Sequence, residues 1–96
     1  MRDYELVTIF SPEISDDSMP QAIDRLGQQI ATRGGAVADT AHWGRRKLAY
    51  PIAKFYEGNY VVTQLQMEPN QTRGLEVALR ISDDVLRHLL VRKDEV

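Results

Sequence analysis

The sequence predicts an α+β fold with the element order βαββαβ. Four segments have the alternation or the β-branched and aromatic composition of strands, and two segments between them place apolar residues at the spacing of an amphipathic helix. A chain of 96 residues with 43% hydrophobic residues can fill one core but not two independent ones. We therefore expect a single domain over residues 1–93, with a short C-terminal tail at 94–96.

Strands are expected at 4–10, 36–48, 58–68 and 85–91. The first of these segments, YELVTIF, is rich in β-branched and aromatic residues. The second and third flank residues 49–57, which contain a proline turn. Together they predict a hairpin with a long tip.

The first helix is expected to begin near Met19. Apolar residues recur from there at the i, i+3, i+4, i+7 spacing, and a Gly-Gly pair at 34–35 ends the pattern. Ser18 with Gln21 three residues later predicts a capping box, whereas Ser15 could cap an additional turn earlier. Either start gives a helix that covers one face of the sheet.

The second helix is expected after Pro69-Asn70, with Asn70 as its N-cap. Its inner face is formed by three apolar residues, Leu75, Ala78 and Leu79. A Ser-Asp-Asp turn at 82–84 then leads to the last strand.

Short connections and right-handed crossovers arrange these elements as a ferredoxin-like fold, a four-stranded antiparallel sheet with both helices on one face. The first and third strands are central, and the second and fourth lie at the edges. One alternating row of the third strand is expected to face the helices, namely Val61, Thr63, Leu65 and Met67. No further element is predicted to cover the other face, so that face is free for a partner.

Positive charge is concentrated in two segments although the whole chain is acidic. The formal net charge is −2 and the isoelectric point is about 5.6. Acidic residues gather before the first helix and near the C-terminus, whereas cations gather in 45–54 and 87–93. Such segregation predicts a positive face on an acidic protein.

Several function classes are excluded or disfavoured by residues that the sequence lacks. The absence of cysteine excludes disulfides, thiol nucleophiles and cysteine-ligated metal centres. No apolar run approaches the roughly 18 residues of a membrane span, and no signal-peptide core is present, so we expect a cytoplasmic protein. There is no nucleophile motif and no pair of converging carboxylates. We therefore expect no enzyme, no cofactor and no small-molecule substrate.

The two histidines are not expected to form a metal site. His42 and His88 fall on different predicted strands and have no ligand spacing. His88 alternates with Leu86 and Leu90, which favours a structural or interface role.

The segment HWGRRKLAYPIAK at 42–54 has four cations, two aromatic residues and no acid. In one interpretation the segment is a solvated hairpin tip. Its cations would then keep a sheet edge soluble, while Trp43 and Tyr50 pack locally. As an RNA-binding element, its cations would neutralise phosphates while an aromatic ring stacks on a base or packs against a protein. Composition alone leaves both interpretations open.

Three segments together resemble one family. MRDYE at 1–5, GRRKLAYPIAK at 44–54 and LRISDDVLR at 79–87 are similar to bacterial small-subunit ribosomal protein six. The resemblance extends over almost the whole chain, and the basic pair followed by LAYPIAK is its most specific part.

The resemblance implies a ribosome-bound RNA-binding protein without catalytic activity. It implies two partners, the central domain of small-subunit ribosomal RNA and small-subunit ribosomal protein eighteen. The RNA-facing residues that it implies are Arg2, Tyr4, Arg45, Arg46, Lys47, Lys54, Arg80 and Arg87. Trp43 and Tyr50 are expected to support the hairpin or a protein interface.

Two other hypotheses belong to different classes. A small interaction or ligand-sensing domain would form homodimers through the open sheet face. A cofactor-free enzyme would use a pocket on that face with His88 or Tyr60.

Overall fold

The computed structural model describes residues 1–93, so the predicted tail at 94–96 lies outside the described residues. The elements follow the predicted order, with one short 3₁₀ turn added before the second helix. They are β1 (Arg2–Phe10), α1 (Met19–Thr32), β2 (Ala36–Ile52), β3 (Phe55–Met67), η1 (Pro69–Gln71), α2 (Thr72–Ile81) and β4 (Val85–Arg92). No helix in this range is long and apolar enough to cross a membrane.

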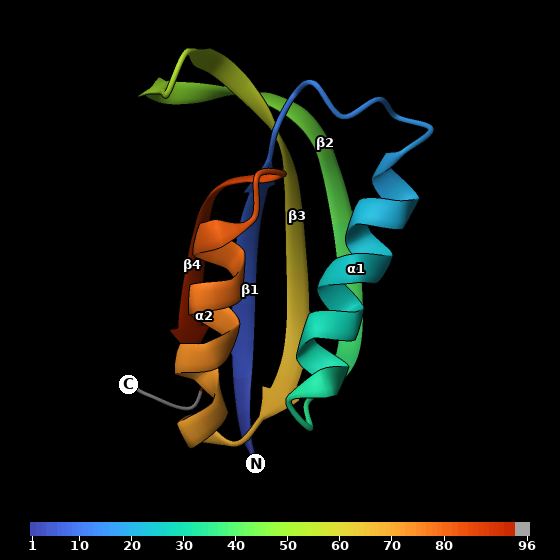
Figure 1. Ribbon diagram of the computed structural model, residues 1–96, viewed down its shortest axis with the longest axis vertical. Helices are drawn as coiled ribbons and strands as arrows, with labels where there is room; N and C mark the ends of the chain where they lie inside the picture. Colours follow the sequence, from blue (N-terminus) through green and yellow to red (C-terminus); the bar gives the residue numbers. More distant parts are fainter. Residues whose placement is uncertain (94–96) are drawn as a thin grey trace.

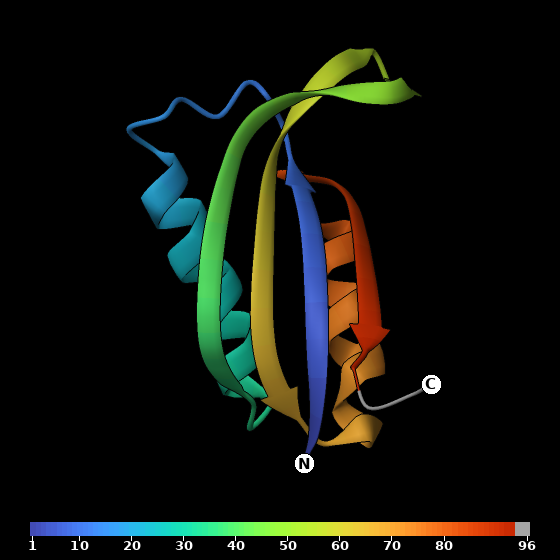
Figure 2. The ribbon, with the colours of Figure 1, turned by 180° about the vertical axis from the view of Figure 1, so that it is seen from behind.

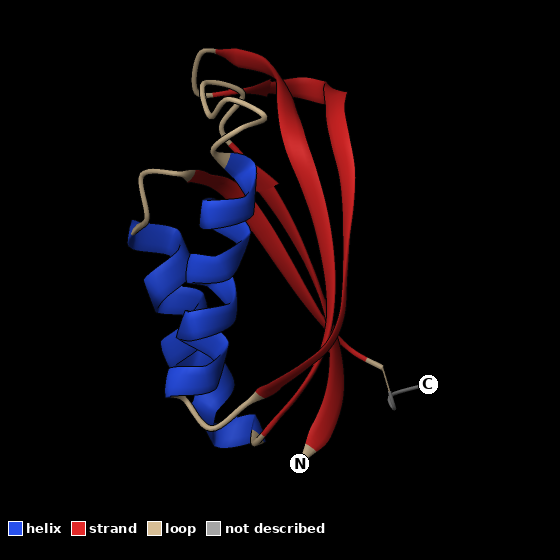
Figure 3. Cartoon of the chain, turned by 90° about the vertical axis from the view of Figure 1, so that its right-hand side faces the viewer, coloured by secondary structure: helices blue, strands red, loops and turns tan. Residues whose placement is uncertain are grey.

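All neighbouring strands are antiparallel, in the order β2-β3-β1-β4. Both helices lie on one face of the sheet (Figure 1), and the opposite face of the described part has no helix over it (Figure 2). Figure 3 shows the two layers edge-on. The predicted ferredoxin-like fold, its central strands and its open face are thus confirmed.

The core lies between the sheet and the helices. The predicted inner row of β3 is confirmed, because Val61, Thr63, Leu65 and Met67 are each at most 2% exposed. From the helices, Ile30 and Leu75 are fully buried against this row, and Leu79 is nearly so. Ala78 is only half-buried. The alternation along one strand therefore identified the side of the sheet that carries the helices.

Helix α1 begins at Met19 as predicted, but the predicted capping box is wrong. Ser18 has helical backbone angles and makes no side-chain cap. Its hydroxyl instead accepts a hydrogen bond from the Ser15 hydroxyl, while the Ser15 carbonyl accepts from the N–H groups of Ser18 and Met19. Ser18 therefore lacks the extended backbone conformation that an N-cap residue normally has.

The start of α2 also differs from the prediction. Asn70 is not an N-cap, because residues 69–71 form a 3₁₀ turn and the helix begins at Thr72. The Thr72 hydroxyl donates to the Pro69 carbonyl at 2.8 Å. Pro69 fixes its own φ and begins this tight turn, which delays the helix.

The long hairpin tip predicted at 49–57 is wrong in detail. Strand β2 continues to Ile52 and β3 begins at Phe55, so only Ala53 and Lys54 form the turn. Ala53 has a φ of 55° there. Pro51 is tolerated within β2 because the pairing register shifts between Lys47 and Ile52, where a missing N–H breaks no regular ladder.

Candidate nucleic-acid interface

The β2–β3 hairpin extends beyond the rest of the sheet. Strand β1 pairs with β3 only as far as Phe10 opposite Asn59, whereas β2 and β3 remain paired up to Ile52 opposite Phe55. We call residues 46–58 the arm. Figures 1 and 2 show that it leaves the sheet beyond the end of β1 and bends across toward the start of β4. The arm carries four of the predicted residues, namely Arg46, Lys47, Tyr50 and Lys54.

Two glycines shape the base of the arm. Gly44 has a φ of 87° beside a register shift, and such a bulge bends and twists a strand. At Gly58 an added Cβ would lie 2.5 Å from Ile9 Cγ2 and 3.2 Å from the Phe10 carbonyl oxygen. The arm is thus packed directly on β1 where it departs from the sheet.

Two cations of the arm lie over aromatic rings. The Arg46 guanidinium carbon is 5.1 Å from the ring centroid of Trp43, and Lys54 Nζ is 5.8 Å from that of Phe55. Lys47 is exposed and has no hydrogen bond or ion pair with any described residue. The contacts of Arg46 and Lys54 are within the range of cation–π attraction, and they leave both charges at the surface.

The arm and the neighbouring Trp43 also expose large aromatic side chains. Tyr56 is 73% exposed, Tyr50 55% and Trp43 52%. Sequence reasoning missed Tyr56 and Phe55, because both were placed inside a predicted turn. The FYEGNY segment that contains them has three aromatic residues, which favour strands, and this signal could have extended β3 backward to include them.

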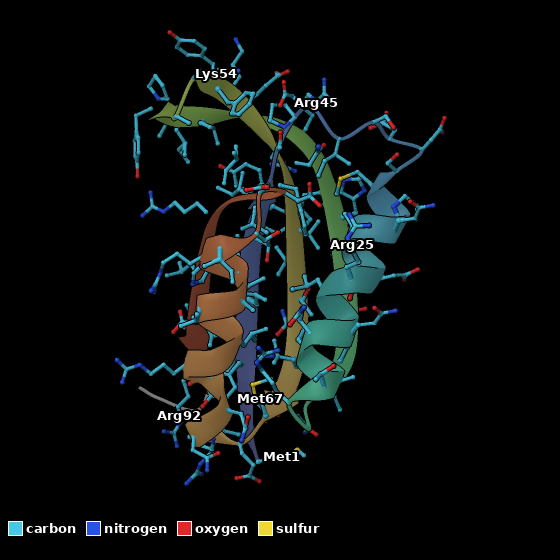
Figure 4. The ribbon with its side chains drawn as sticks, in the orientation of Figure 1. Met1, Arg25, Arg45, Lys54, Met67 and Arg92 are labelled. Atoms are coloured by element: carbon cyan, nitrogen blue, oxygen red, sulfur yellow. The ribbon has the colours of Figure 1, made fainter. Side chains whose placement is uncertain are left out.

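Arg45 is bonded to the protein itself. Its Nη2 donates to the Pro12 carbonyl oxygen at 2.8 Å, and its Nη1 lies 3.6 Å from Glu57 Oε1. Figure 4 shows Arg45 where the hairpin passes the segment between β1 and α1, and Lys54 at the far end of the hairpin. Arg45 therefore stands apart from the three other cations of this segment.

Arg87 and Tyr50 connect β4 to the far end of the arm. The Arg87 guanidinium carbon lies 5.8 Å from the Tyr50 ring centroid, and its Nη1 donates to the Tyr50 hydroxyl. The structure thus brings together two predicted residues that are far apart in the sequence.

A groove of about 220 Å³ lies between the arm and the open face of the sheet. Its wall on the arm includes Leu48, Tyr50 and Ile52, and its wall on the sheet includes Val7 and Leu89. The walls are largely apolar, and Leu89 is 58% exposed. An apolar surface beside a polar rim is typical of a protein-binding site.

Three predicted residues lie away from the arm. Arg2 pairs with Met67 at the opposite end of β1, and Arg80 is exposed on α2 in the helix layer. The surface role predicted for Tyr4 is corrected, because this side chain is 6% exposed and belongs to the core. Its position in the strand explains this, since Tyr4 lies on the same face of β1 as the buried Leu6.

The two histidines lie on different strands, and His88 lines the groove together with Tyr60. His88 Nε2 lies 3.1 Å from Glu76 Oε1 on α2, and the His88 side chain is only 13% exposed. His88 therefore joins β4 to α2, which agrees with the predicted structural role. His42 is exposed, and no group of three or more potential metal ligands occurs in this range.

Comparisons with known proteins identify the family. Residues 3–92 match the family model described as ribosomal protein S6. The small ribosomal subunit protein bS6 of Caldanaerobacter subterraneus subsp. tengcongensis is 41% identical over 95 residues, which cover 99% of this chain and 100% of that one. The crystal structure of 30S ribosomal protein S6 from Thermotoga maritima aligns with a TM-score of 0.89 at 28% identity, covering 96% of this chain and 87% of that one.

A second solved structure shares the fold alone. The C-terminal domain of the MgtC protein from Mycobacterium tuberculosis aligns with a TM-score of 0.59 at 10% identity, over 99% of this chain and 90% of that one. The family model and the 41% identical relative cover nearly the whole chain and confirm the resemblance found in the sequence. The chain therefore belongs to the ribosomal protein S6 family.

Proposed function

We propose that this protein is a structural component of the small ribosomal subunit. In this proposal it binds the central domain of small-subunit ribosomal RNA together with small-subunit ribosomal protein eighteen, is bound to the ribosome in the cytoplasm and supports assembly and translation. The observation that carries the proposal is the arm, which concentrates surface cations and exposed aromatic rings on a chain of net charge −2.

The RNA-binding part of the proposal rests on Arg46, Lys47 and Lys54. Their charges lie at the surface of the arm, where phosphates can approach and release their counterions. Exposed rings beside them offer flat faces on which unpaired bases can stack. Arg2, Arg80 and Arg87 are further candidates at separate places on the surface.

The protein-binding part rests on the open face of the sheet. The groove beneath the arm is apolar, and Leu89 and Val91 of β4 are 58% and 43% exposed beside it. Tyr50 lines this groove, and Trp43 lies beneath the Arg46 guanidinium. Two partners on adjacent surfaces would hold the RNA jointly, so each would need only moderate affinity.

The test is binding of the purified protein to a central-domain RNA fragment, with and without ribosomal protein eighteen, across a salt series. We expect weak binding alone and tighter, salt-sensitive binding with the partner. Salt-independent binding, or no binding in either condition, would contradict the proposal. A stable dimer without RNA would instead favour the homodimer hypothesis, for which the exposed Leu89 and Val91 offer an apolar surface.

A further inference from the structure

Arg45 differs from the other cations of its segment because both of its terminal nitrogens face protein acceptors. One acceptor, the Pro12 carbonyl oxygen, lies 2.8 Å from Nη2 in the segment that joins β1 to α1. The other, Glu57 Oε1, lies 3.6 Å from Nη1 on the opposite strand of the arm. One guanidinium therefore joins the arm to the rest of the protein.

This contact lies at the last position where the hairpin has a third strand beside it. Arg45 pairs with Asn59, and Asn59 also pairs with Phe10 at the end of β1. The buried Asn59 amide donates to the Ser11 carbonyl at 3.1 Å. Arg45 and Asn59 thus bind the carbonyls of two consecutive residues, Pro12 and Ser11, from opposite strands of the hairpin.

The arm beyond this point is a two-stranded hairpin, and such hairpins have little stability of their own in water. Its far end contacts the sheet through Tyr50 and Arg87. The orientation of the arm therefore depends on a few contacts near its two ends. A planar guanidinium can donate to two acceptors at once in a fixed geometry, which a lysine ammonium reproduces poorly.

We infer that Arg45 is a positioning residue that holds the arm over the open face, and that it is not one of the phosphate ligands. The inference rests on the proposed function, since it assigns different roles to neighbouring cations of the same site. Because the arm carries the surface cations and one wall of the groove, its orientation sets the geometry of both binding surfaces. Loss of Arg45 should then weaken RNA binding and protein binding together.

The test compares Arg45→Met with Lys47→Met. Both changes remove one positive charge from β2, but Lys47 has no bonded partner among the described residues. Three quantities are measured for each variant: amide hydrogen exchange of the arm in the free protein, affinity for ribosomal protein eighteen, and the salt dependence of RNA binding with that partner present. For Arg45→Met we expect arm exchange about three- to tenfold faster, because the lost contacts are partly exposed.

The other two readouts separate positioning from phosphate binding. Arg45→Met should lower the affinity for the protein partner several-fold and leave the salt slope of RNA binding unchanged. Lys47→Met should leave arm exchange and protein affinity unchanged and reduce the salt slope by about 0.7 to 0.9. Unchanged arm exchange in Arg45→Met, or a salt slope reduced as in Lys47→Met, would overturn the inference.

Arg45→Lys adds a test of the guanidinium itself. This variant keeps the charge but reproduces the double contact poorly, so its arm exchange should remain faster than in the wild type. Arm exchange fully restored by lysine would contradict the inference. If the wild type binds neither RNA nor ribosomal protein eighteen, the proposed function fails, and the exchange measurement on the free protein still decides whether Arg45 holds the arm.

Discussion

The sheet body and the arm are stabilised in different ways. In the body, strands and helices share a continuous core in which Leu6, Val61 and Leu75 are fully buried. In the arm, most side chains are exposed or half-buried, and its position depends on Gly58 packing, on Arg45 and on the contact between Tyr50 and Arg87. The body thus supplies the stability of the protein, and the arm carries the surface groups that we propose bind partners.

The largest expected effect comes from truncating the core. Leu75→Ala removes a fully buried side chain of α2 and leaves a cavity, which should cost about 2 to 5 kcal/mol of unfolding free energy. Tyr56→Ser in the arm should change it by less than about 0.5 kcal/mol, because Tyr56 is 73% exposed. Denaturant unfolding of both variants measures these changes. An equal loss of unfolding free energy in the two variants would contradict the difference between body and arm.

The next largest effect is expected at the base of the arm. Gly58→Ala would place its Cβ 2.5 Å from Ile9 Cγ2, so the Ile9 side chain or the backbone beside it must shift, at a cost of about 1 to 3 kcal/mol. Gly27→Ala is the matched control. No atom lies within 4 Å of an added Cβ there, and alanine in helix α1 should stabilise the protein by about 0.5 to 1 kcal/mol. The unfolding temperature should therefore fall for Gly58→Ala and rise for Gly27→Ala. A shift in the same direction for both variants would contradict the close packing at Gly58.

A smaller effect is expected at the far end of the arm. Tyr50→Phe keeps the ring beneath the Arg87 guanidinium and removes the hydroxyl that accepts its hydrogen bond. Because the contact is exposed, global stability should fall by less than about 1 kcal/mol. Arm amides should exchange faster, whereas those of the central strand β1 should not. Exchange that rises equally in β1 would show that the arm is not a separate unit.

The sequence predicts the body better than the arm, for a physical reason. Burial repeats at a fixed period, so the alternation in β3 and the spacing in α1 were sufficient to predict the layers. The proline turn at 49–57 predicted a hairpin in the segment that forms the arm, although the observed turn is shorter. Tyr4 was misplaced because this prediction followed the family resemblance without using the face that the strand period assigns.

Details of the arm depend on contacts between residues far apart in the sequence, which the periodic pattern of apolar residues does not predict. The Arg45 contact joins residues 33 positions apart, and the contact between Arg87 and Tyr50 joins residues 37 apart. The missing capping box at Ser18 accompanies a helical backbone conformation at that residue, which the spacing of Ser18 and Gln21 does not encode. Which of several neighbouring arginines bonds to the protein and which remains at the surface is decided only when the chain has folded.

The most direct test of the account is the salt dependence of RNA binding for a variant that replaces Arg46, Lys47 and Lys54 together with methionine, measured with ribosomal protein eighteen present. The account predicts a salt slope smaller by about 2 to 3 than in the wild type, because three phosphate contacts are lost. Circular dichroism and unfolding should match the wild type. A slope equal to that of the wild type would contradict the claim that the arm binds RNA through its surface cations.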